Sequence, residues 1–196
     1  MVAIFDGIDM TEKQLMQALS LDRAVYPREY WLDRQTVLSY WQTRPEVYIY
    51  AAEGKDLIAY LNTSCIDRES YLALCSGRQN DLCIGAENLR EPSPGTENYL
   101  YFSSIVVDAS YRGNGIARRL LFRFGEKLEA LRRRGICFSD ILADAVSAHG
   151  EKLCLSLGMR FDKRTSCGSK LFRYPMKQGE PNKELSSFIQ KLCGSQ

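Results

Sequence analysis

Apolar residues recur at helical spacing in two stretches near the start of the chain. The first runs from about Asp9 and ends before Pro27, because proline cannot continue a helix. Asp9 is the predicted N-cap, with Glu12 three residues later as its capping-box partner. A second, shorter helix is predicted from Asp33 to about Trp41. The apolar residues near one face of the first helix are Leu15, Leu19 and Val25.

Runs of β-branched and aromatic residues predict strands farther along the chain. Residues 47–64, VYIYAAEGKDLIAYLNTS, indicate a hairpin whose turn is EGKD. Residues 99–107, YLYFSSIVV, are apolar or small on both alternating faces, which predicts a central strand covered on each side. The remaining predicted strands are a buried one over residues 137–145 and a final pair over 159–163 and 170–176.

Helical spacing returns between these later strands. Apolar residues from Ile116 to Leu131, with arginines between them, predict an amphipathic helix that ends at Gly135. A second helix is predicted over residues 147–158. Helices, a hairpin and then strand–helix–strand–helix–strands make an α/β arrangement with a mixed sheet.

Two segments lack this regularity. Residues 66–98 end in the loop LREPSPGTEN, and their middle can hold a short helix or strand. The segment is longer than a connector requires, and long loops in compact domains are often functional. We expect residues 1–177 to form a single domain. Residues 178–196 are expected to form a polar tail with at most one short helix, packed on the body or on a partner.

Composition narrows the class of protein. The chain has 196 residues, 45% of them hydrophobic, and a formal net charge of +2, which is too small to indicate nucleic acid or membrane binding. Seven cysteines are scattered without a C-x-x-C pair, a pattern that argues against disulfides or a zinc site and favours a reducing compartment. No apolar run approaches the roughly 20 residues of a membrane span. We therefore predict a cytoplasmic protein with no metal.

The stretch YRGNGIARRLL, residues 111–121, combines glycines with the start of a helix. Gly113 and Gly115 let the main chain approach a large anion, and the helix N-terminus offers unpaired amides to it. The alternative is a tight strand-to-helix connection that binds nothing. A Walker loop is excluded because Ile116 follows Gly115, and a dinucleotide fingerprint because Arg118 stands where a small residue is needed.

The same stretch resembles the acyl-CoA-binding motif of the GNAT acetyltransferase superfamily. Its signature, Arg or Gln, two residues, Gly, one residue, then Gly or Ala, matches Arg112, Gly115 and Ala117. Residues 157–159, Leu-Gly-Met, resemble the Leu-Gly-Phe that ends a later helix in that family. The two motifs are in register, and the resemblance extends over residues 99–174.

The resemblance implies a GNAT-like fold, a mixed and mostly antiparallel sheet flanked by helices. It implies transfer of an acetyl group from acetyl-CoA to an amine by direct attack in a ternary complex. The pyrophosphate would lie against the amides of residues 113–118, and the pantetheine arm along the backbone of residues 105–107. The residues implied in acetyl-CoA binding are Ile105, Val106, Val107, Arg112, Gly113, Asn114, Gly115, Ile116, Ala117 and Arg118.

Catalytic candidates lie on the strand before the glycine turn. Tyr99, Tyr101 and Ser103 share a face by alternation unless a bulge shifts the phase, and Tyr101 and Ser103 are the candidates that line the site. Glu97 is the nearest carboxylate in sequence. Each tyrosine can equally be a packed, hydrogen-bonded core residue. A single histidine, His149, is more typical of a surface or capping position.

Cys154 is the candidate that protonates the leaving thiolate. In the family a tyrosine stands four residues before the glycine of Leu-Gly-Phe, and here that position holds Cys154. The alternative is a plain core cysteine. Because the tyrosine is missing and no base is obvious, the second hypothesis for the whole chain is a non-catalytic CoA-binding regulatory module of the same fold.

The acceptor is predicted to carry an amine, on a small molecule or on a protein or peptide. Residues 26–31, YPREYW, and the segment 66–98 are the regions expected to contact it. We expect no nucleic acid or membrane partner, and a monomer or homodimer.

Overall fold

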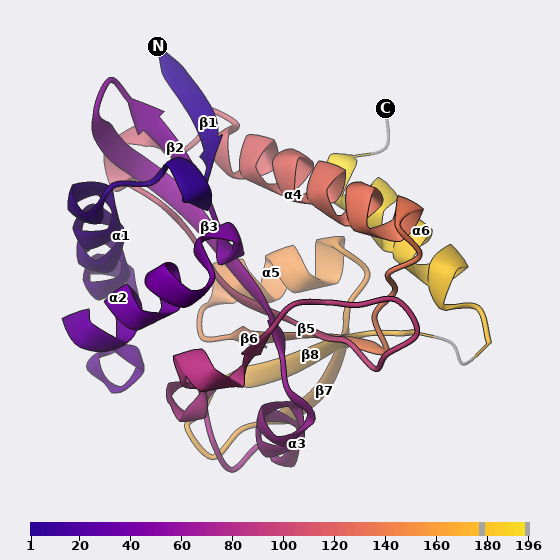
Figure 1. Cartoon of the computed structure of the whole chain (residues 1–196). Helices are drawn as coiled ribbons and strands as arrows, with labels where there is room; N and C mark the ends of the chain where they lie inside the picture. Colours follow the sequence, from indigo (N-terminus) through magenta and orange to yellow (C-terminus); the bar gives the residue numbers. More distant parts are fainter. Residues whose placement is uncertain (177–178, 195–196) are drawn as a thin grey trace.

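The computed structural model describes residues 1–176 and 179–194, and it is built around one sheet (Figure 1). The strand order is β1-β2-β3-β5-β6-β8-β7, with β4 paired to β3 beside this path. β5 and β6 are parallel, and the other pairs are antiparallel. The predicted mixed, mostly antiparallel sheet is confirmed. The strands are β1 (Val2–Asp6), β2 (Tyr48–Glu53), β3 (Asp56–Ile66), β4 (Leu89–Arg90), β5 (Tyr99–Val107), β6 (Asp140–Ala145), β7 (Arg160–Arg164) and β8 (Lys170–Tyr174).

Helices cover both faces of the sheet (Figure 1). On one face, α1, α2 and α3 pack on side chains that include Tyr60 and Tyr101. On the other face, α4, α5 and α6 pack on a larger core that includes Phe102 and Phe172. The result is a three-layer arrangement. The helices are α1 (Glu12–Val25), α2 (Arg34–Thr43), α3 (Arg68–Ser76), α4 (Ile116–Arg133), α5 (Ala148–Ser156) and α6 (Pro181–Cys193).

The start of the chain differs from the prediction in two ways. Thr11, not Asp9, caps α1, because its hydroxyl accepts from the Gln14 amide and the Gln14 side chain accepts from the Thr11 amide at 2.9 Å. Asp9 lies instead in a 3₁₀ turn, Gly7–Asp9. Residues Val2–Asp6 form a strand that was not predicted. This strand lies at the edge of the sheet and pairs only with β2.

β5 is less completely covered than its sequence predicts. Residues Tyr99 to Phe102 are buried, whereas Ser103, Ser104 and Ile105 are only half-buried. The reason is that β6 pairs with β5 only as far as Phe102 opposite Ala143.

The C-terminal segment joins the core of the molecule. α6 has 13 residues and packs along α4, burying Leu185, Phe188 and Leu192. The contact is close at Gly125 of α4, where an added Cβ would lie 2.7 Å from the Cys193 sulfur. The predicted boundary between residues 177 and 178 lies outside the described residues.

Candidate active site

A bulge interrupts β5 at the middle of the sheet. Asn62 pairs with Ser104, but the next residue of β3, Thr63, pairs with Phe102, so Ser103 is an extra residue on β5. Beyond this point β5 continues to Val107 without β6 beside it. The two parallel strands therefore open into a V, and bulges at such places re-aim side chains and free backbone groups.

The bulge also changes which side chains share a face. Tyr101 lies on the face of α1–α3, and both Ser103 and Ser104 line the same cavity on that face. After the bulge the alternation is reversed, so that Val106 packs toward α1 while Ile105 and Val107 pack on the α4 face. Tyr101 and Ser103 thus come together, as predicted by alternation, and Ser104 joins them through the bulge.

The glycine turn presents main-chain donors at the end of β5. Gly113 and Gly115 have φ of 79° and 71°, the left-handed region that side chains rarely adopt. Gly115 is the N-cap of α4, and residues 112–115 are exposed. Within residues 1–176 and 179–194, the amide N–H groups of residues 113–118 have no hydrogen-bond acceptor. Exposed, unpaired amides at the positive end of an 18-residue helix are suited to an anion.

Basic side chains surround this turn without blocking it. The Arg112 Nε donates to the Val107 carbonyl at 3.1 Å, and its side chain is exposed. Arg118 lies near Gly194 at the end of α6, and Arg119 donates to the Val2 carbonyl at 3.0 Å. Ile116 is buried in the core, so only its backbone can face a ligand.

A cavity rich in carboxylates lies beside the opening between β5 and β6. We call it the acidic cavity; it has a volume of about 40 Å³, and a second chamber of about 30 Å³ adjoins it. The two share Leu32, Asp81, Tyr101 and Ser103. The residues that line the acidic cavity are Asp22, Tyr26, Tyr30, Leu32, Asp81, Tyr101, Ser103, Ser104, Asp144 and Val146.

Hydroxyl groups hold its three carboxylates. Asp22, on α1, accepts from the hydroxyl of Tyr60, which in turn lies 3.2 Å from the Ser104 Oγ. Asp81 accepts from Ser103 at 3.3 Å. These contacts link Asp81 directly, and Asp22 through the Tyr60 hydroxyl, to the bulged residues of β5.

Asp144, the first residue of β6 beyond its last pair with β5, is held from the other side. Its Oδ2 accepts from Ser169 at 2.8 Å. Its Oδ1 is buried and has no hydrogen-bond partner among the described residues. An unpartnered buried carboxylate oxygen is costly in a folded protein and calls for a ligand or another explanation.

Burial makes these carboxyl groups weaker acids than usual. It raises the pKa of Asp22 to about 7, although the hydrogen bond from Tyr60 acts in the opposite direction. Burial also raises the pKa of Asp81 to about 6, with a further contribution from the negative charge of Asp144. The pKa of Asp144 is raised for the same main reason. Carboxyl groups with such values in a cavity are typical of functional sites.

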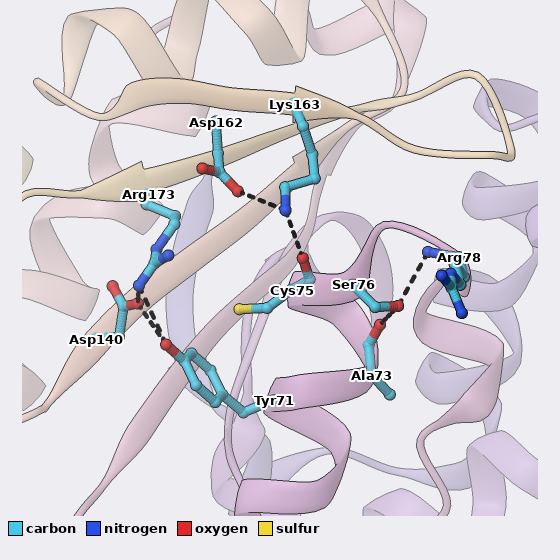
Figure 2. A network of polar contacts seen from close by, with 9 residues as sticks. All are labelled: Tyr71, Ala73, Cys75, Ser76, Arg78, Asp140, Asp162, Lys163 and Arg173. Carbon is cyan, nitrogen blue, oxygen red and sulfur yellow. Dashed lines mark hydrogen bonds and ion pairs between the residues drawn. The ribbon is translucent and has the colours of Figure 1, made fainter.

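A polar network fixes α3 to the sheet (Figure 2). Tyr71 of α3 donates to Asp140 Oδ2 at 3.0 Å, and Arg173 of β8 pairs with the same carboxylate. At the other end of α3, Lys163 donates to the Cys75 carbonyl at 2.8 Å. Segment 66–98, whose middle was expected to hold a short helix or strand, thus contains a helix held against the sheet, and Asp81 follows it in the 3₁₀ turn Asp81–Cys83.

Three other candidates lie away from this cavity. Glu97 is exposed and accepts from the Tyr99 hydroxyl at 2.8 Å, so the carboxylates beside Ser103 are Asp81 and Asp144 instead. His149 is exposed on α5. Cys154 is 6% exposed within the main core, and burial raises the pKa of its thiol to about 12.

Sequence reasoning named the regions around the cavity but not its acids. Residues 26–31 and 66–98 both reach it, through Tyr26, Tyr30 and Asp81. Asp22 and Asp144 were not singled out, because each is an isolated acidic residue within a helix or strand. The sequence feature that could have indicated the cavity is Asp144, because it is a charged residue within a strand predicted to be buried.

The chain is similar to known proteins in sequence and in fold. The sequence model of the acetyltransferase (GNAT) family matches residues 14–138. No curated protein sequence matches the chain.

Several solved structures share the fold. The structure of a NatC complex bound to Gag peptide and CoA superposes with a TM-score of 0.56 at 16% identity, covering 88% of this chain and 95% of that chain. Naa50 from Arabidopsis thaliana, in complex with a bisubstrate analogue, gives 0.54 at 13% identity and covers 88% and 96%. An N-acetyltransferase from Staphylococcus aureus Mu50 gives 0.56 at 16%, covering 90% and 99%.

Across residues 1–176 and 179–194, no helix combines the length and apolar character needed to cross a bilayer. Within the same residues, no group of three or more His, Cys, Asp or Glu side chains is arranged to hold a metal ion.

Proposed function

The chain belongs to the GNAT acetyltransferase family, whose members transfer acyl groups from CoA, and from this premise we propose that it is an N-acetyltransferase acting on an amine. The observation that carries the proposal is the position of the acidic cavity. Its carboxylates lie beside the opening of β5 and β6, and β5 leads from there to the unpaired amides of the glycine turn. In this proposal an ammonium site and an anion site flank one strand.

Binding of acetyl-CoA would use the backbone. The amides of residues 113–118 would hold the pyrophosphate, with Arg112 adding charge, as helix N-termini do for phosphates. The free edge of β5 over residues 105–107 would pair with the amide groups of the pantetheine arm. Acetyl-CoA itself supplies the activated acetyl thioester.

The side chains of the acidic cavity would prepare the amine. Asp81 is positioned by Ser103 and, with a pKa of about 6, is ionised at neutral pH, so it can accept the proton of a bound ammonium. The freed amine nitrogen then forms a bond to the acetyl carbonyl carbon, giving a tetrahedral oxyanion that collapses as the carbon–sulfur bond breaks. The sulfur leaves as a thiolate and takes up the second proton, which the nitrogen loses on becoming an amide. A free backbone N–H of β5 past the bulge would stabilise the oxyanion of the intermediate.

Tyr101 and Ser103 act in this scheme as positioning residues. Tyr101 is 2% exposed and lines both chambers, and burial raises the pKa of its hydroxyl, so it stays protonated and donates hydrogen bonds. Holding the two reactants in place can itself supply roughly 7 to 11 kcal/mol of the barrier reduction.

The direct test is release of CoA thiol from acetyl-CoA with a panel of amines, beside calorimetric titration of CoA. We expect binding of CoA and amine-dependent turnover. Binding of CoA with no turnover on any primary amine or peptide N-terminus would contradict the proposal and favour the regulatory module of the same fold. Absence of CoA binding would contradict both.

A further inference from the structure

The register of β5 on β3 decides which backbone groups of β5 face the opening left by β6. Asp108, the residue after β5, donates its N–H to the Ile58 carbonyl at 2.8 Å. Bonded and non-bonded pairs alternate along an antiparallel ladder, so Ile105 and Val107 direct their N–H and C=O groups away from β3. The Arg112 Nε reaches the Val107 carbonyl at 3.1 Å from that side, as this alternation requires.

Ile105 carries the first of these outward amides after the bulge. β6 pairs with β5 only as far as Phe102, so the Ile105 amide lies at a free edge of the sheet. The hydroxyl of Tyr26, which lines the acidic cavity, lies near the same amide, and the amide therefore faces the cavity. A backbone donor at this place is suited to the carbonyl oxygen of an acyl group.

The two serines of the bulge are tied to different elements. Ser103 donates to Asp81 at 3.3 Å. The Ser104 Oγ lies 3.2 Å from the hydroxyl of Tyr60 on β3. Tyr60 has a single hydroxyl proton, which it donates to Asp22, so Ser104 is the donor in its contact with Tyr60. The bulge is therefore held by one hydrogen bond on each of its two serine side chains.

Tyr60 is a fixed point beside a strand that has lost one of its neighbours. Its side chain is 2% exposed and packs in a core shared with residues of α1. A close-packed ring keeps its hydroxyl in one position. On β5, by contrast, Ser104 follows directly after the extra residue and has no β6 beside it. The contact between the two hydroxyls therefore sets how the backbone leaves the bulge.

We propose that Tyr60 and Ser104 are positioning residues for the acetyl group of acetyl-CoA. Their hydrogen bond sets the orientation of the adjacent Ile105 N–H, which binds the acetyl carbonyl oxygen and then the oxyanion that forms on it. Neither hydroxyl touches the acetyl group, and neither gives up its proton during the reaction. This inference rests on the proposed N-acetyltransferase function.

The first experiment measures the carbonyl band of bound acetyl-CoA, labelled with ¹³C at the acetyl carbonyl, by infrared difference spectroscopy. A hydrogen bond from the Ile105 N–H polarises the C=O bond, so the band should move to lower wavenumber on binding. Most of this shift should be lost in Tyr60→Phe and in Ser104→Ala, while CoA affinity stays unchanged. Tyr50→Phe is the matched control: Tyr50 is also 2% exposed, and its hydroxyl donates to the Asp9 carbonyl, on the neighbouring strand β2.

The second experiment measures steady-state kinetics with the fastest amine of the panel that tests the proposed function. Tyr60→Phe and Ser104→Ala should each lower kcat by about tenfold or more with nearly unchanged KM for acetyl-CoA, because misplacing a reacting group by about 1 Å can cost about 100-fold. Ser104→Ala keeps the bond between Tyr60 and Asp22, so a common effect of both variants does not come from Asp22. The double variant should be no slower than the slower single variant, since both remove one contact.

The outcomes separate this inference from the function on which it rests. A kcat and a carbonyl shift that survive in both single variants overturn it, even where Tm falls, and so do losses that multiply in the double variant; N-acetyltransferase activity would then stand. If no amine is acetylated, the proposed function fails, and the carbonyl band still decides whether Tyr60 and Ser104 position the acetyl group. Absence of the shift in the unaltered protein overturns the inference whatever the turnover.

Discussion

The glycine turn and the acidic cavity lie at the two ends of the same strand opening, yet they are built by opposite means. The turn uses consecutive residues, exposed main-chain amides and positive charge. The cavity uses half-buried side chains from α1, segment 66–98 and β6, and negative charge. Under the proposed function, the site for the donor needs only backbone geometry, whereas the site for the acceptor depends on side-chain identity.

The largest effect is expected from replacing Asp81, the carboxylate that accepts a hydrogen bond from Ser103. Asp81→Asn should lower kcat/KM by about 100-fold, because a positioned general base contributes at least that factor. CoA affinity should stay unchanged. Steady-state kinetics and CoA titration measure the two effects, and Glu69→Gln on the same segment is the control. A loss below threefold would show that Asp81 is not the base.

The corresponding change at the other site is Gly115→Leu. It should weaken CoA binding by about 30-fold, the loss of roughly one hydrogen bond to a charged group. Gly54→Leu is the matched control, because Gly54 also has a positive φ, 63°, and open space around an added Cβ. Both variants should lose similar stability, about 1–2 kcal/mol of backbone strain. Equal CoA affinity in the two variants would place the pyrophosphate elsewhere.

The pH dependence of turnover should follow the protonation of Asp81 in the acidic cavity, whereas CoA binding at the glycine turn should not depend on it. With the pKa of Asp81 at about 6, kcat/KM should fall about tenfold between neutral pH and pH 5, as the base becomes protonated. CoA affinity should be nearly constant over this range. A rate that stays flat down to pH 5 in the unaltered protein would argue against a carboxylate base.

The stability of the folded protein should also depend on pH through Asp22, in a direction that follows from its raised pKa. The pKa of Asp22 is raised from 3.8 to about 7 by burial, so the folded state binds more protons than the unfolded state between these values. Stability from this group therefore falls as pH rises from 4 to 7, and Asp22→Asn should raise Tm by about 2–5 °C at pH 8 and by less at pH 4.

Asp56→Asn provides the opposite case for that measurement. Hydrogen bonds from Lys13 and Gln17 lower the pKa of Asp56, so its ionised form favours folding and its removal should lower Tm slightly at pH 8. The same sign for both variants at pH 8 would contradict the assignment of Asp22 as a carboxylate made unfavourable by burial.

The smallest expected effect is at Cys154. Cys154→Ala should change turnover less than about twofold, because the thiol lies in the core and its raised pKa makes it a poor proton donor. The matched control is Cys65→Ala, another buried core cysteine with a raised pKa. Both should cost about 1 kcal/mol of stability. A hundredfold loss of turnover in Cys154→Ala alone would restore its catalytic assignment.

Much of the architecture could be read from local pattern. The hairpin of β2 and β3, the amphipathic α4 and the α5 helix before Gly158 were all predicted close to their observed bounds. Two local predictions were wrong or missing: Asp9 is not the cap of α1, and β1 was not expected. Thr11 is the N-cap because its side chain accepts from the Gln14 amide and the Gln14 side chain accepts from the Thr11 amide.

The sequence by itself determined the order of elements and the glycine turn, since hydrophobic periodicity and backbone conformation depend on residues close together in the chain. Only the tertiary structure decided the acidic cavity. Its carboxylates, at positions 22, 81 and 144, share no spacing that a pattern could reveal. They meet because β5 gains an extra residue at Ser103 and parts from β6, and because α3 is anchored over the sheet by Asp140 and Arg173. Their chemistry arises from that meeting, because burial and mutual repulsion raise a pKa only where side chains come together in space.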